Sequence, residues 1–136
     1  MAYSVSEDQI ALYKRDGAVL LRGALSADEL ALMERGVEES RAGPAGFHAL
    51  LEGNDGAGTT YKEFLPILSC PSLRALNERG TIAAIAGQLM EAASAHFIFD
   101  EIFYKLKGTV LATPWHQDAP FYNVRGDQLV RVWMPR

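Results

Sequence analysis

The chain contains little cysteine and no long hydrophobic run. Cys70 is its one cysteine in 136 residues, so no internal disulfide can form. Because Cys70 precedes a proline in an apolar stretch, a small packed side chain is favoured over a nucleophile. No apolar run has the length of a transmembrane helix, and acidic residues stand near the N-terminus where a signal peptide would be apolar. These absences predict a soluble protein of the reducing cytoplasm.

Positive charge is also scarce. Lysine and arginine number 13 against 17 aspartates and glutamates, which gives a net charge of −4. This balance argues against nucleic acid or an anionic membrane as the main binding partner. The hydrophobic content of 49% and the charged content of 22% are typical of an ordinary globular domain. The length fits one domain.

Two capping boxes predict helices in the first half of the chain. Ser6 is followed three residues later by Gln9, and Ser26 by Glu29, the spacing with which side chain and backbone cap each other. Gly17 is typical of the residue just after a helix. The elements expected in residues 1–94 are helices from Ser6 to Gly17, from Ser26 to about Glu39 and from Leu73 to about Glu91, the last broken near Gly80, with a short strand over 18–21.

Residues 42–60 have a different composition. They contain Gly43, Pro44, Gly46, Gly53, Asn54, Asp55, Gly56 and Gly58, which argues against a regular element. We therefore expect a long loop here. Such a loop is either a lid or binding segment, or a segment without a binding role.

The last third of the chain, 95–136, is expected to be rich in β-structure. Residues 95–107 are aromatic and β-branched and predict a strand of about a dozen residues. Gly126 and Asp127 predict a turn. Residues 128–134 predict a further strand that alternates between two faces, with Val130, Val132 and Met134 on one and Leu129, Arg131 and Trp133 on the other.

His116 and Asp118 carry the most informative pattern. In an extended segment, residues two positions apart point the same way, so this imidazole and carboxylate can converge on one metal ion. One further histidine would complete the triad of two histidines and one carboxylate that holds non-haem Fe(II). A histidine paired with a nearby aspartate is also common in structural hydrogen bonding. Pro114, Trp115 and Pro120 favour the metal, because a rigid apolar surround restricts water and fixes ligand rotamers.

The motifs around this pair carry a resemblance to a known family. The block resembles the phytanoyl-CoA dioxygenase family in Tyr104-Lys105, in Thr113 to Asp118, in Gly126-Asp127-Gln128 and in Val132-Trp133. The N-terminal pattern is similar too, with Asp16-Gly17, Arg22-Gly23 and Leu25-Ser26. The resemblance covers nearly all of the chain, and its C-terminal block is the specific part.

The resemblance implies a fold and a chemistry. The fold class would be α+β, with N-terminal helices packed on part of a double-stranded β-helix (a cupin-like jelly roll). The cofactor would be Fe(II), with 2-oxoglutarate as co-substrate. The expected activity is that of an oxidoreductase, a dioxygenase that uses O2 to hydroxylate a small organic molecule. The presence of Asp118 favours hydroxylation, because related halogenases lack this carboxylate.

The resemblance also implies roles for particular residues. His116 and Asp118 match the family's proximal metal ligands. Gln117 matches a residue that contacts 2-oxoglutarate in some members. Lys105, or alternatively Lys107, matches a lysine on the co-substrate carboxylate, where an ammonium group suits a dicarboxylate.

Each of these side chains also has an ordinary structural interpretation. Both lysines could instead lie on a solvated strand edge. Trp115, Tyr122 and Trp133 are candidates for the substrate pocket, although packing is as good an interpretation for Tyr122 and a better one for Trp133.

The chain departs from the family pattern in its missing ligands. The distal histidine and the 2-oxoglutarate-binding arginine have no match, since His48 and His96 stand too early and Arg131 and Arg136 stand too close to the motif. We expect residues 1–136 to be one partial domain, the N-terminal part of such an enzyme and inactive alone. Its incomplete sheet would have open edges that promote self-association.

Two other interpretations stay open. The chain is a non-catalytic fold fragment or binding module without a complete metal site, or a second chain completes the site by strand addition. The sequence does not identify the substrate.

Overall fold

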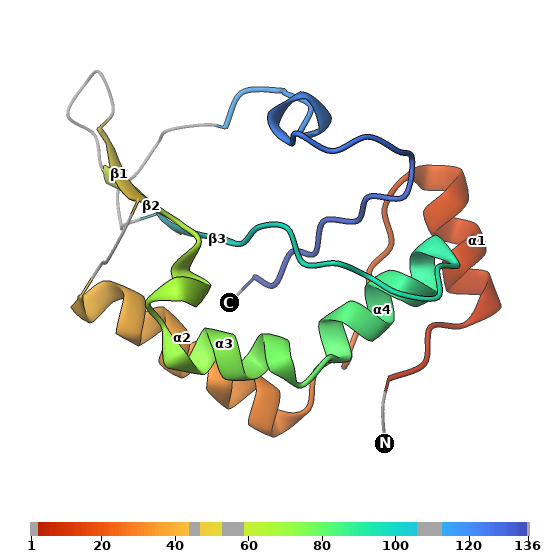
Figure 1. Cartoon of the computed structure of the whole chain (residues 1–136), viewed down its shortest axis with the longest axis horizontal. Coiled ribbons are helices and arrows are strands. Elements are labelled where there is room, and N and C mark those ends of the chain that lie inside the picture. The colour runs from red at the N-terminus through yellow and green to blue at the C-terminus, as the bar shows by residue number, and fades with distance from the viewer. Residues whose placement is uncertain (1–2, 44–46, 53–58, 106–112, 136) are drawn as a thin grey trace.

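The computed structural model describes residues 3–43, 47–52, 59–105 and 113–135. Over these residues the architecture is mixed α+β, which confirms the expected class. Its helices are α1 (Glu7–Asp16), α2 (Ala27–Ala42), α3 (Pro71–Glu78) and α4 (Thr81–Met90), with short 3₁₀ turns at Pro66–Leu68 and Ala119–Phe121. Its strands are β1 (Phe47–Glu52), β2 (Thr59–Phe64) and β3 (Glu101–Lys105), and they form an antiparallel sheet in that order (Figure 1).

Both predicted capping boxes are confirmed. The Ser6 hydroxyl accepts a hydrogen bond from the Gln9 amide at 3.2 Å, and the Gln9 side chain accepts one from the Ser6 amide at 2.9 Å. Ser26 and Glu29 form the same pair at the start of α2. Gly17 ends α1 with a φ of 74°, a left-handed conformation that glycine adopts without steric cost.

The predicted break near Gly80 is also confirmed, while the predicted strand over 18–21 is wrong. Gly80 has a φ of 78° and separates α3 from α4. Residues 18–21 have no strand partner among the described residues. Val19 and Leu21 pack instead against the core cluster of Val5, Ile85 and Leu89.

The prediction of one long loop over 42–60 is wrong for residues 47–52 and 59–60, which belong to strands. Residues 47–52 and 59–64 form the β1–β2 hairpin, with a register from Phe47 opposite Phe64 to Glu52 opposite Thr59. Gly53, Gly56 and Gly58 stand between the two strands and Gly43 and Gly46 before β1, whereas 47–52 itself contains neither glycine nor proline. Pairing of β2 with β3 stabilises the hairpin, and a composition argument cannot see that contact. The interpretation of this loop as a lid or binding segment now concerns residues 53–58, which lie outside the described residues.

Strand β3 is shorter than predicted because its partner ends. Strand β2 stops at Phe64, after which Leu65 has a left-handed φ of 53° and Pro66 begins a 3₁₀ turn. The amide of Leu65 still donates to the carbonyl of Asp100 at 2.9 Å. Residues 95–100 therefore have no ladder partner in the described part of the chain, and 106–107 lie outside it.

The strand predicted over 128–134 is wrong as well, although its alternation of faces holds in part. This segment is attached to its surroundings by side chains and not by a ladder. Gln128 donates to the carbonyl of Met90, Val130 packs against the core cluster, and Trp133 stacks on Phe103.

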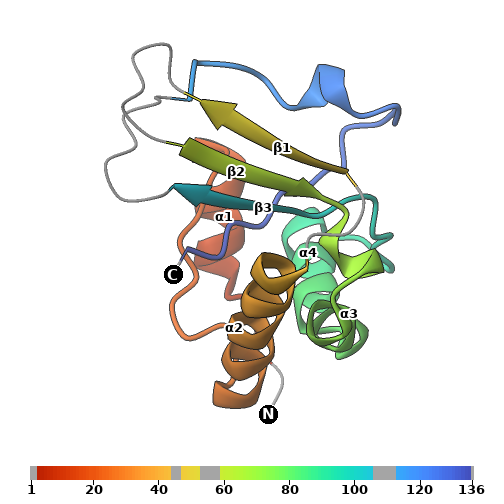
Figure 2. The ribbon, with the colours of Figure 1, turned by 90° about the vertical axis from the view of Figure 1, so that its left-hand side faces the viewer.

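The two faces of the sheet have different neighbours. The helices lie on one side of the sheet in Figure 2, and Tyr104 donates from that face of β3 to the carbonyl of Val37 in α2 at 2.6 Å. Lys62 lies opposite Phe103 on the other face, which the C-terminal segment contacts through Trp133. No helix within the described ranges is long and apolar enough to cross a membrane.

Candidate metal centre

His116 and Asp118 do come together. Their segment forms neither helix nor strand between Thr113 and the 3₁₀ turn that begins at Ala119, and the Nε2 atom of His116 lies 3.2 Å from Oδ1 of Asp118. Two ligands at adjacent corners of an octahedron, each about 2.1 Å from the metal, stand about 3 Å apart. The observed separation therefore suits two protein ligands of one ion.

The tautomer of His116 is determined by a backbone contact. The Nδ1 atom lies 2.7 Å from the carbonyl oxygen of Pro114. A carbonyl only accepts, so Nδ1 is the nitrogen that donates to Pro114, and Nε2 is the nitrogen that faces the Asp118 carboxylate. A proton on Nε2 would join the two groups in a hydrogen bond, and a metal ion could replace that proton and bind both atoms. The Pro114 carbonyl also gives His116 the outer contact that metal-bound histidines usually have.

The second oxygen of Asp118 binds an arginine. Nη1 of Arg131 donates to Oδ2 of Asp118 at 2.7 Å and to the Tyr122 hydroxyl at 3.1 Å, while Nη2 donates to Glu101 of β3. Although burial lowers the pKa of Arg131, its hydrogen bonds to Asp118 and Glu101 raise it on balance, so the side chain remains charged.

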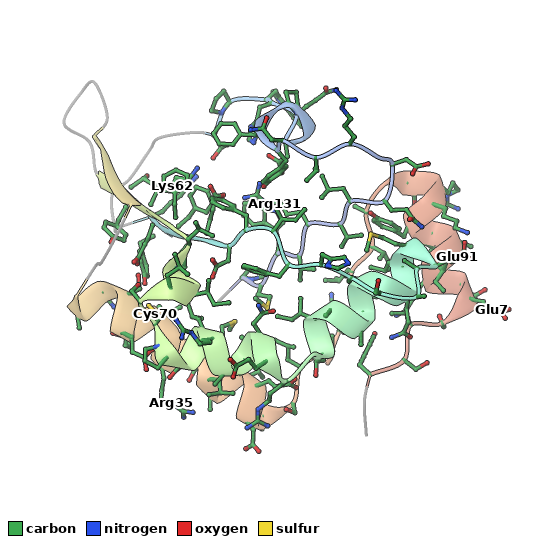
Figure 3. All side chains as sticks on the ribbon, viewed as in Figure 1. Glu7, Arg35, Lys62, Cys70, Glu91 and Arg131 are labelled. Atoms are coloured by element: carbon green, nitrogen blue, oxygen red, sulfur yellow. The ribbon has the colours of Figure 1, made fainter. Side chains whose placement is uncertain are left out.

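A lysine on the neighbouring strand completes a row of charges. Nζ of Lys62 lies 2.8 Å from Glu101 and sits over the rings of Phe64 and Phe103, at 4.2 and 4.8 Å from their centroids. Figure 3 shows Lys62 and Arg131 in the same region between the sheet and the C-terminal segment. We call the sequence of contacts Lys62–Glu101–Arg131–Asp118–His116 the charge chain.

The charge chain contains functional candidates that sequence reasoning missed. The sequence pattern placed Arg131 and Trp133 on the same face of an expected strand. It did not show which residues Arg131 contacts. Lys62 lies just past the expected loop, where no register could be assigned. The only available signal was the alternation that puts Glu101, Phe103 and Lys105 on one face of β3.

The two predicted co-substrate residues differ in their position relative to these groups, since Lys105 stands at the opposite end of β3 from Glu101. Gln117 is exposed between the two candidate ligands in sequence. Lys105 is exposed at the end of β3, on the face that also carries Glu101. Lys107, the alternative, lies outside the described residues.

The aromatic surround is less enclosed than predicted. Trp115 is fully exposed and Pro120 is exposed too, so neither shields the pair from water. The prediction that Trp133 packs in the core is wrong, since it is 71% exposed and stacks on Phe103 with centroids 6.2 Å apart. Tyr122 is half-buried against Phe99, and burial raises the pKa of its hydroxyl.

A third protein ligand is not among the described side chains. Within the described ranges, no group of three or more histidine, cysteine, aspartate or glutamate side chains is arranged to hold a metal. His96 is exposed at the approach to β3, and the side chain of His48 lies outside what the structure describes. A shallow pocket of about 200 Å³, lined by Leu68, Arg74 and Glu78, lies over α3 and takes no part in this centre.

Comparison with known families agrees with the motif. The phytanoyl-CoA dioxygenase (PhyH) family matches residues 13–135, and the chain therefore belongs to that family. The resemblance drawn from the sequence is confirmed. No curated protein matches the chain, and no solved structure does. Members of the family are oxygenases that generally use Fe(II) and 2-oxoglutarate, with O2 and a small-molecule substrate.

Proposed function

We propose that this protein acts in the Fe(II)- and 2-oxoglutarate-dependent hydroxylation of a small organic molecule, and that His116 and Asp118 are two of the iron ligands. The observation that carries the proposal is the 3.2 Å approach of Nε2 to Oδ1, with Nδ1 held by Pro114. The family match supports the choice of iron and 2-oxoglutarate.

The residues of this chain would hold and orient the metal. When bound, Fe(II) and 2-oxoglutarate would activate O2, which is the oxidant for C–H hydroxylation. Asp118 offers Oδ1, because Arg131 occupies Oδ2, and His116 offers Nε2. Two protein ligands leave positions open for the co-substrate, and the triad requires one ligand more than the described side chains provide.

Lys105 and Gln117 are our proposed contacts to 2-oxoglutarate. Lys105 places a cation on the same strand face as the charge chain, where a dicarboxylate would find a partner. The antiparallel β1–β2–β3 sheet is compatible with a double-stranded β-helix, which we propose as the fold.

Metal titration tests the two ligands. Anaerobic titration with Co(II), a coloured substitute for Fe(II), in the presence of 2-oxoglutarate should give visible absorption that His116→Ala and Asp118→Ala abolish. His96→Ala is the matched control, because it removes an equal imidazole that is exposed and distant in sequence. Absorption that persists in both ligand variants would refute the assignment.

Succinate release tests the reaction itself. With the full-length gene product, a panel of small organic substrates with Fe(II), 2-oxoglutarate and O2 should give succinate that depends on His116. The competing function is a non-catalytic binding module, which is favoured by the lack of a third ligand among the described side chains. Weak metal binding without any succinate would support the module, whereas tight one-to-one binding of Fe(II) would contradict it.

A further inference from the structure

We propose that Arg131 is a positioning residue for Asp118, and that Glu101 and Lys62 hold it in place. The proposal rests on the proposed function, because it assigns Arg131 the task of presenting one carboxylate oxygen to the metal. Nothing in the family match assigns Arg131 this role.

The geometry separates the two oxygens of Asp118. Nη1 of Arg131 takes Oδ2 at 2.7 Å, while Oδ1 stays at 3.2 Å from Nε2 of His116. The guanidinium is planar, and its second terminal nitrogen is engaged by Glu101. Since both nitrogens are used, rotation of the fork would break a contact. The carboxylate of Asp118 is thereby held with one oxygen free for a cation.

The charges make this arrangement compatible with a divalent ion. The Glu101 side chain is only 6% exposed and lies between Lys62 and Arg131. A buried carboxylate is costly unless it is paired, so each cation stabilises it. Glu101 in turn offsets the positive charge of Arg131. Asp118 can therefore attract a metal ion that an isolated arginine beside it would repel.

Aromatic side chains restrict the guanidinium further. Its central carbon lies 5.6 Å from the centre of the Trp133 ring, and Trp133 stacks on Phe103 of β3 with an angle of 6° between the rings. The Tyr122 hydroxyl accepts from Nη1 at 3.1 Å. A lysine at this position would keep the charge but lose the fork and the planar stacking.

Co(II) affinity, the Co(II) absorption spectrum and the urea unfolding midpoint of the metal-free chain would be compared among variants. Arg131→Met should weaken metal binding by about 10- to 100-fold, the usual loss when an outer contact of a metal ligand is removed. Arg131→Lys and Glu101→Gln should both weaken it and change the absorption spectrum. Arg125→Met is the matched control, because it removes an exposed arginine of the same segment; its affinity should stay within about 2-fold of wild type.

The outcomes are distinguishable from failure of the proposed function. If the wild-type chain shows no metal binding that depends on His116 and Asp118, the proposed function fails and this proposal fails with it. If that binding is present and folded Arg131→Met keeps wild-type affinity and spectrum, only the role of Arg131 is overturned. A lower urea midpoint with unchanged affinity would also overturn it. If Arg131→Met does not fold, unchanged Co(II) affinity in both Arg131→Lys and Glu101→Gln would overturn the role of Arg131.

Discussion

Two adjacent carboxylates at the start of β3 have opposite surroundings. Glu101 is paired with Lys62 and Arg131. Asp100 accepts a hydrogen bond from the Ile67 amide at 3.2 Å through Oδ2, while its Oδ1 is buried without a hydrogen-bond partner among the described residues. Burial, aided by the nearby charges of Glu63 and Glu101, raises the pKa of Asp100 to about 6. Asp100 thus lacks the two cationic partners that its neighbour Glu101 has.

This contrast predicts a pH dependence of stability. Asp100 binds its proton in the folded state up to about pH 6, but in the unfolded state only up to its ordinary pKa of 3.8. Its contribution to the free energy of unfolding therefore decreases as the pH rises between these values, by on the order of 1–2 kcal/mol after allowance for solvent screening. Asp100→Asn should remove that decrease.

Urea unfolding at pH 4.5 and pH 7 measures the effect. The difference in free energy of unfolding between Asp100→Asn and wild type should be larger at pH 7, in favour of the variant. Asp127→Asn, which changes an exposed aspartate, should behave as wild type at both pH values. Parallel pH profiles for wild type and Asp100→Asn would contradict the assignment.

At the scale of elements, the contact between α2 and α3 depends on a glycine. Gly36 is buried in α2, and a Cβ atom there would overlap Cγ and Cδ2 of Leu73 in α3. Alanine raises helix propensity by about 1 kcal/mol over glycine, whereas overpacking costs about 1–3 kcal/mol. The backbone amide of Leu73 would lie 3.2 Å from the added atom, so the side chain alone cannot relieve the contact. The cost of the overlap should therefore exceed the gain in helix propensity.

We expect Gly36→Ala to lower the free energy of unfolding by about 1–2 kcal/mol in urea or heat denaturation. Gly43→Ala is the matched control, since the added Cβ would meet nothing within 4 Å and the φ of −156° is open to alanine. Equal stability of the two variants would show that α2 and α3 are less closely packed than described.

The elements also show what the sequence could and could not predict. The capping boxes at Ser6 and Ser26 were found because their partners stand three residues away. The His116–Asp118 pair was found for the same reason, at a separation of two. The β1–β2 hairpin was missed because its stability depends on a strand about 40 residues later, and Arg131 was missed because its partner Glu101 stands 30 residues earlier. Interactions between residues a few positions apart can be predicted from sequence patterns, whereas pairing between distant segments cannot.

At the scale of the whole molecule, large apolar side chains lie exposed in the C-terminal segment. Trp115, Phe121 and Trp133 are each more than two-thirds exposed, and β1 and β3 are the outer strands of the described sheet. Exposed apolar surface and open strand edges both promote association. Leu20, which lies outside this segment, is 69% exposed. This contrast offers a test of which surface associates.

We expect the chain to self-associate with rising concentration, as measured by size-exclusion chromatography with light scattering. The double substitution Trp115→Ser with Phe121→Ser should shift the equilibrium toward the monomer by about 10-fold or more, because burial of two aromatic rings contributes several kcal/mol to an interface. Leu20→Ser should leave the equilibrium unchanged, since it removes an exposed apolar side chain that lies outside the C-terminal segment. A single monomer peak for wild type at every concentration would exclude association through the C-terminal segment. It would also remove the reason to expect a second chain at the site of His116 and Asp118.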